Sequence, residues 1–250
     1  MKKYILLLCF MWVGAAVLQA QDNPFGMKAA KPESSYAFTS SMTFKMTNVN
    51  RKGKSNWMSY QYYFSPRSTA VGMKFLDSSE GEKAGGGMDF MIIDIGQARM
   101  FTFMESKMVV GMAMRQDKLH ETLEKENAAI SVSKTSETKT IMGYECEGYS
   151  VKNEKDKSDV IMWVSKKRVE PMADLGAQMA KAFSGSARGG QQNYFAYNAH
   201  PELAKIAREG KAILGYTSKS DKGEVAEMEL TALEPRINYT FKASDYKSMF

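Results

Sequence analysis

Residues 99–114 read RMFTFMESKMVVGMAM, and every methionine in this segment falls on an even position. Residues 99–104 and 108–114 each have the length of a β-strand and are joined by a short link. Successive side chains of a strand point to opposite faces, so the even positions of each strand share a face. If the two strands are neighbours, one face of the sheet carries the side chains of Met100, Met104, Met108, Met112 and Met114.

The same period of two continues outward from this segment. On the N-terminal side, Tyr36, Phe38, Met42, Phe44 and Met46 share one parity, which predicts a strand with all five on one face. The segments 138–151 and 160–165 are predicted to form a hairpin around a charged tip at 153–159. Further strands are predicted at 57–64, 69–76, 88–95, 211–218, 225–233 and 236–243.

Three segments have helical rather than strand character. Residues 171–183 carry Leu175, Met179 and Phe183 four positions apart, which gives an apolar stripe along one helix face. Residues 201–209 begin with proline and are followed by Gly210, as helix ends often are. A third short helix is predicted at 117–127. The links between strands are mostly too short for parallel crossovers, so the sequence predicts a mainly β protein with one antiparallel sheet and two or three short helices.

The N-terminus has the features of a secretory signal peptide. Lys2 and Lys3 precede an apolar run from Tyr4 to Leu18, and a small residue, Ala20, precedes polar sequence. The run is too short to favour a membrane-spanning helix. We therefore predict a signal peptide at 1–20, a flexible lead-in at 21–33 and one domain at 34–250, with the protein exported to the periplasm or secreted and soluble after cleavage near Ala20.

Composition restricts the classes of protein. The chain is 44% hydrophobic and 25% charged, which is ordinary for a globular domain and excludes a wholly disordered or collagen-like chain. The formal charge of +6 falls to +4 without Lys2 and Lys3, and it is too dispersed to favour nucleic-acid binding. The run from Lys166 to Arg168 is expected to touch anionic headgroups only weakly, so any envelope association is weak.

Catalytic motifs are absent from the sequence. His120-Glu121 begins like a zinc-protease motif, but no second histidine follows before or at Lys125, and His200 is a helix-start residue. After signal cleavage Cys146 is the single cysteine, and its strand parity favours a buried, unreactive thiol. We predict a non-enzymatic protein without a cofactor, a catalytic residue or a metal ligand set.

The 20 methionines allow three interpretations. They fill an ordinary core, since methionine packs into irregular spaces, and the protein is then a structural or interaction module of the cell envelope. Alternatively they line a cavity for a hydrophobic or lipid-like ligand, or they bind Cu(I), which prefers thioethers, with Met112 and Met114 as the nearest pair. Against copper, Met88 and Met91 lie three apart and are expected on opposite strand faces. The favoured hypothesis is a hydrophobic ligand held by Met100, Met104, Met108, Met112, Met114, Leu175, Met179 and Phe183.

One further pattern resembles a known family. The segment KTIMGYECEGY at 139–149, Trp163 on the next predicted strand, and the ending with Phe241 and SDYKSM at 244–249 resemble a secreted bacterial family, the domain of unknown function four-four-one-two. Its members are similar in outline to the lipoprotein carriers LolA and LolB. The resemblance implies an open antiparallel half-barrel whose concave face is covered by helices, and it implies no catalytic residues.

Overall fold

The chain forms one large open antiparallel sheet. The computed structural model describes residues 28–79, 81, 86–94, 96–113, 130–153, 156–173, 201–220 and 223–248. Their strands make a 13-stranded sheet in the order β1-β8-β7-β6-β5-β4-β3-β13-β12-β11-β10-β9, with β15 added beside β8, and a separate two-stranded sheet of β14 and β2. Only the pairing of β15 with β8 is parallel among the described strands. The predicted mainly antiparallel β architecture is confirmed.

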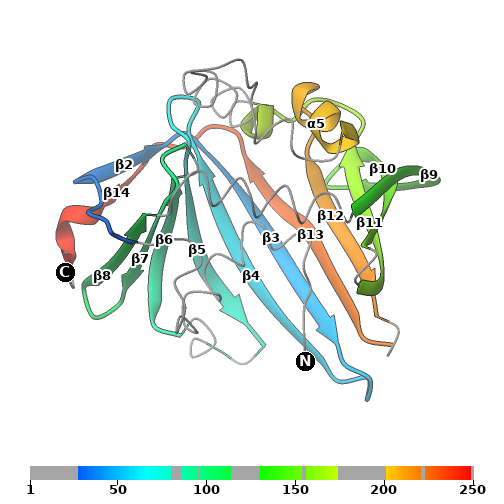
Figure 1. Ribbon diagram of the computed structural model, residues 1–250, viewed down its shortest axis with the longest axis horizontal. Coiled ribbons are helices and arrows are strands. Elements are labelled where there is room, and N and C mark those ends of the chain that lie inside the picture. The colour runs from blue at the N-terminus through cyan, green and yellow to red at the C-terminus, as the bar shows by residue number, and fades with distance from the viewer. Residues whose placement is uncertain are drawn as a thin grey trace.

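The strands are mostly long, and they fan out across the molecule (Figure 1). In chain order they are β1 (Lys28–Ala29), β2 (Ser35–Phe38), β3 (Ser40–Val49), β4 (Ser55–Phe64), β5 (Ala70–Ser78), β6 (Met88–Asp94), β7 (Arg99–Met104), β8 (Met108–Ala113), β9 (Ile130–Ile141), β10 (Tyr144–Asn153), β11 (Asp156–Ser165), β12 (Ile213–Lys219), β13 (Val225–Glu234), β14 (Tyr239–Lys242) and β15 (Lys247–Ser248). The described helical elements are α5 (Pro201–Arg208), the 3-10 turn η4 (Ala243–Asp245) and the helical residues 170–173.

A cluster of aromatic rings covers one face of the sheet at the β5–β8 end. The strands β2 and β14 pack there from outside the large sheet, at the left of Figure 1. Each strand alternates between this face and the other, so that Phe101 and Phe103 point into the cluster while Met100 points away. We call this set the aromatic cluster: Tyr36, Phe38, Tyr63, Phe90, Phe101, Phe103, Tyr239 and Phe241.

Helix α5 lies over the other end of the sheet (Figure 1). Its residues Leu203 and Ile206 pack with Met162 and Val164 of β11. The start and end of α5 agree with the predicted helix at 201–209, and Gly210 follows with a positive φ of 67°. Residues 171–173 of the predicted helix at 171–183 are helical, and the rest of that segment lies outside the described residues. The predicted helix at 117–127 lies outside the described residues.

Two segments that were each predicted as a single strand form two strands in the structure, and the alternation of side chains does not show where the first strand of each pair ends. The chain passes from the small sheet to the large one at Thr39, so Tyr36 and Phe38 join the aromatic cluster whereas Met42 and Phe44 lie in a different core cluster. The prediction that all of these side chains share one face is therefore wrong. The reason is that a single residue between two strands allows the backbone to change sheets.

The segment predicted as one strand from Thr138 to Val151 is itself a hairpin. It consists of β9 and β10, and its turn is Met142-Gly143, with φ angles of 51° and 79°. Two consecutive positive φ angles suit the twist of a two-residue hairpin turn, and glycine supplies one of them without strain. Methionine is an unusual residue for the other position, which is why the local sequence carries no clear turn signal there.

The predicted lead-in at 21–33 contains a strand in its described part. Lys28 and Ala29 form β1, which pairs with Ala113 and Met112 at the edge of β8. The backbone of Ala30 then donates a hydrogen bond to the carbonyl of Gly111 at 3.0 Å. Two residues are too few to show a period, so the sequence does not predict this strand.

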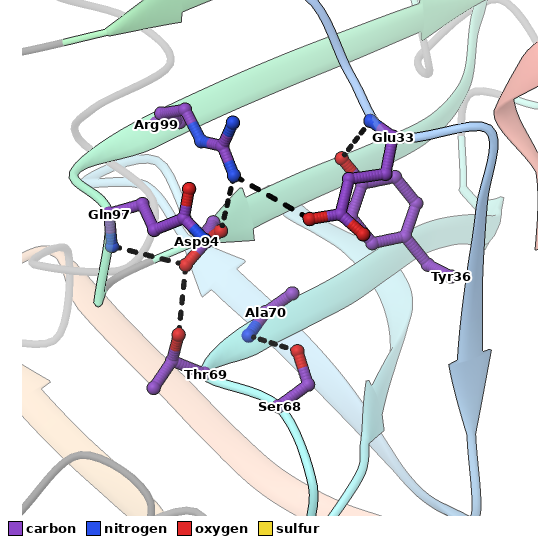
Figure 2. Close-up of polar contacts among 8 residues, drawn as sticks. All are labelled: Glu33, Tyr36, Ser68, Thr69, Ala70, Asp94, Gln97 and Arg99. Carbon is purple, nitrogen blue, oxygen red and sulfur yellow. Dashed lines mark hydrogen bonds and ion pairs between the residues drawn. The ribbon is translucent and has the colours of Figure 1, made fainter. Parts of the chain in front are cut away.

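A buried carboxylate holds the turn between β6 and β7. Asp94 is almost fully buried and accepts hydrogen bonds from the Thr69 hydroxyl at 2.9 Å and from the Gln97 backbone at 3.2 Å (Figure 2). Its other oxygen pairs with the Arg99 guanidinium at 3.2 Å, and Arg99 also reaches Glu33 at 3.7 Å. These bonds tie three chain segments together at the rim of the aromatic cluster.

We expect Asp94→Asn to lower the free energy of unfolding by about 1–2 kcal/mol, since the amide keeps the shape but loses the charge-assisted bond to Arg99. Urea unfolding followed by tryptophan fluorescence measures this loss. The matched control is Asp77→Asn, at an exposed position of β5, which should change stability little. Equal effects of the two substitutions would show that the Asp94 network contributes nothing specific.

Candidate functional site

The side chains of one face of the sheet form continuous cross-strand rows rich in methionine and tyrosine. Directly paired residues of adjacent strands point to the same face, so the register defines each row. We call this surface the sulfur face. Its first row is Met162, Tyr216, Met228, Met46 and Met58, the second is Leu230, Phe44, Tyr60 and Phe75, the third is Leu233, Met42, Tyr62, Met73 and Met91, and the fourth is Val71, Ile93, Met100 and Met112.

Burial varies along these rows. Met42, Met73 and Met100 are buried, with Met42 completely inaccessible. By contrast, Tyr60, Tyr62, Met88 and Met112 are only partly buried while packing against the same core cluster. The centre of the sulfur face is thus part of the core, and its flanks keep apolar surface that further apolar groups can cover.

The register places the methionines of β7 and β8 on one face, as their parity predicts. Met100 pairs directly with Met112, and Thr102 pairs with Val110. Met104 and Met108 have the same parity as these residues within their strands, which places them on the same face. Met100 is buried at 2% exposure, whereas Met108, at the start of β8 and beside Lys247 of β15, is 38% exposed.

A β-bulge overturns one argument from the sequence. The register of β6 against β7 shifts between Met88 and Phe90, so one extra residue separates Met88 from the following alternation. Met88 and Met91 consequently pack in the same core cluster rather than on opposite faces. The strict period of two that predicts their separation fails because a bulge reverses the parity.

Tyrosine hydroxyls donate hydrogen bonds to two thioether sulfurs on the sulfur face. The Tyr60 hydroxyl lies 2.8 Å from Met58 Sδ, and the Tyr216 hydroxyl lies 3.4 Å from Met46 Sδ. Burial raises the pKa of Tyr60 and raises that of Tyr62 strongly. Both phenols therefore stay protonated at neutral pH, and they add no charge to the central rows.

The single cysteine of the domain is buried, as predicted. Cys146 is completely inaccessible, and burial raises the pKa of its thiol. Its Sγ lies 3.5 Å from the carbonyl of Tyr144, to which the S–H donates. A nucleophilic cysteine must be accessible and ionised, and burial of Cys146 disfavours both.

Several predicted site residues lie outside the described residues. They are Met114, Leu175, Met179 and Phe183, together with His120 and His200. The described residues therefore bring together four of the eight predicted ligand-binding side chains. Among the described residues, no group of three or more histidine, cysteine or acidic side chains forms a metal-binding cluster. No helix in this part of the chain is both long and apolar enough to cross a membrane.

Sequence reasoning missed the contribution of the C-terminal strands to the sulfur face. Met228 pairs with Met46, and Tyr216 pairs with Met228, although β3 and β13 lie far apart in the sequence. Parity within β13 places Ala226, Met228 and Leu230 together, but no local pattern shows that β3 is the neighbour. Predicting this part of the sulfur face would have required knowing that β13 pairs with β3 and in which register.

Comparison with solved structures gives distant likenesses. An uncharacterized conserved protein from Thermus thermophilus has a TM-score of 0.41 and 10% identity, over 83% of this chain and 89% of its own. PNGF-II has a TM-score of 0.38 and 15% identity over 84% of this chain, which spans only 30% of the PNGF-II chain. A domain assigned to outer membrane lipoprotein sorting, from Vibrio parahaemolyticus, has a TM-score of 0.30 and 10% identity, over 88% of this chain and 89% of its own.

Comparison with the curated proteins gives no match. A family model does match, over residues 38–234, which is most of the chain and includes every row of the sulfur face. The predicted family membership is thereby confirmed, and the chain belongs to the family described as "Domain of unknown function (DUF4412)".

Proposed function

We propose that this protein is exported, has no enzymatic activity and binds a hydrophobic, acyl-chain-like ligand on the sulfur face. The observation that supports the proposal is the set of partly buried methionines and tyrosines that flank the buried centre of this face. The basic start and apolar run at 2–18 support export.

Methionine suits a ligand of variable shape. Its side chain is unbranched and polarisable, so it adjusts to chains of different length and bend. A ligand leaving a membrane must regain about 0.8 kcal/mol for each methylene group that it transfers, which requires continuous apolar contact. The partly buried Tyr60, Tyr62, Met88 and Met112 would supply this contact, and the uncharged state of the two tyrosines keeps their phenols from adding charge to it.

The proposal predicts that a charge on the flanks of the sulfur face weakens ligand binding. Met88→Lys and Met112→Lys place an ammonium group at partly buried positions beside the core. We expect each variant to lose most affinity for a dansylated undecanoic acid, by about 10-fold or more, since burying a charge against an acyl chain costs several kcal/mol. Fluorescence titration of the purified protein measures the affinity.

The matched control is Met142→Lys, which makes the same exchange in an exposed turn, where Met142 is 50% exposed. It should bind as the wild type does. The native ligand is sought by mass spectrometry of lipids extracted from protein purified from its own cell envelope. Absence of a copurifying lipid, together with equal probe binding by all three variants, would contradict the proposed function.

A further inference from the structure

Three methionines of the first row occupy directly adjacent positions on neighbouring strands. Met228 of β13 pairs with Met46 of β3, and Met46 pairs with Met58 of β4. Direct partners on an antiparallel sheet have Cβ atoms about 4.5–5.5 Å apart. Three thioethers on flexible side chains, all on one face, are thus within reach of a single point above β3.

Two of the three sulfurs in this triad accept hydrogen bonds from tyrosines. Tyr216 donates to Met46 Sδ at 3.4 Å, and Tyr60 donates to Met58 Sδ at 2.8 Å. A thioether sulfur has two lone pairs, so one remains for a further partner after each hydrogen bond. Met46 and Met58 are partly exposed, and Met228 beside them is buried at 8% exposure. The triad is therefore accessible at Met46 and Met58 and closed at Met228.

We infer that Met46, Met58 and Met228 form a binding site for a soft monovalent cation, Cu(I) or its analogue Ag(I). Thioether sulfur is a soft, neutral ligand, which selects Cu(I) over hard cations. The site differs from the pair Met112 and Met114 that the sequence indicated, and it depends on register across three strands. The triad lies in the first row of the sulfur face, but the inference does not rest on the proposed acyl-chain binding.

Thioether ligands make a distinctive prediction about pH. Sites built from cysteine or histidine release protons when they bind metal, so their affinity falls as the pH falls. A thioether has no proton to release. Cu(I) affinity is therefore expected to stay constant from about pH 7 to about pH 5, a range in which a histidine site weakens. Cys146 is buried, and the raised pKa of its thiol keeps it out of competition.

The test is an anaerobic titration of the exported protein, purified after removal of its signal peptide and so without Cys9, with Cu(I) in competition with a bathocuproine chelator. One copper ion per chain is expected. The double variant Met46→Leu/Met58→Leu should bind Cu(I) at least about 100-fold more weakly, since it removes two of the three ligands. Loss of a residue that only supports a metal ligand already lowers metal affinity by about 10–100-fold. Leucine conserves volume, so the fold should persist, which circular dichroism checks.

The matched control is Met108→Leu/Met142→Leu, which removes two exposed methionines elsewhere and should leave the affinity unchanged. In wild-type protein labelled with ¹³C at the methionine methyl groups, Ag(I) should shift the signals of the three triad residues. Unchanged triad signals, copper binding that survives in the Met46/Met58 variant, or affinity that falls with pH would each overturn the site. None of these results bears on whether the dansylated acyl probe binds.

Discussion

Replacing Phe90 by alanine should lower the free energy of unfolding by about 3–5 kcal/mol. Phe90 is 1% exposed and lies at the centre of the aromatic cluster. Its ring stacks on Phe241 with centroids 4.2 Å apart and contacts the rings of Tyr63 and Phe38 at 5.5 and 6.2 Å. Truncation leaves a cavity between two sheets, which these rigid rings cannot collapse to fill.

Guanidinium unfolding of wild type and variant measures this loss. The control is Phe75→Ala, because Phe75 is a partly exposed ring that makes an edge contact with Tyr60. It should cost about 1–2 kcal/mol. A loss for Phe90→Ala no larger than that of the control would mean that the aromatic cluster does not anchor β2 and β14 to the large sheet.

The second large effect is expected at Gly72, on β5 beneath the same rings. A Cβ atom there would lie 2.7 Å from Cζ of Phe90 and 2.9 Å from Cζ of Phe38. Both rings are fixed by their neighbours, so Gly72→Ala should destabilise the protein by about 2–3 kcal/mol through overpacking. Thermal unfolding gives the change in stability.

A double-mutant cycle identifies the cause of that loss. Phe90→Leu shortens the side chain that a methyl group at Gly72 would meet, so adding it to Gly72→Ala should recover part of the lost stability. The two substitutions are then strongly non-additive, as expected for residues in contact. If the free-energy changes of the two substitutions were strictly additive, the destabilisation by Gly72→Ala would come from the backbone and not from the contact with Phe90.

Local periodicity predicted most strands of the sheet. It assigned side chains to the wrong face where a strand contains an irregularity. The alternation at 99–114 correctly placed Met100, Met104, Met108 and Met112 on one face, since the pairing of β7 with β8 shows no register shift. The same rule failed between Met88 and Met91, where one extra residue reverses the alternation. Alternation alone does not reveal where a strand contains a bulge.

The aromatic cluster and the methionine triad were beyond sequence reasoning for a different reason. Parity continues through Thr39 and so groups Tyr36 and Phe38 with Met42, while the backbone changes sheets there. Met228 joins Met46 only through the pairing of β13 with β3. Local sequence predicts which residues of a strand share a face, but the choice of neighbouring strand depends on the packing of the whole chain.

Strand β9 forms one end of the large sheet in the described part of the chain. This strand pairs on one side with β10, and no described residue pairs with its outer edge. A long free edge is a template on which a foreign strand can add and start a fibril. Its residues 131–140 are rich in serine, threonine and charged side chains, including the exposed Lys134 and Glu137, and an incoming strand would have to strip water from them. The strand thus carries its own protection against aggregation.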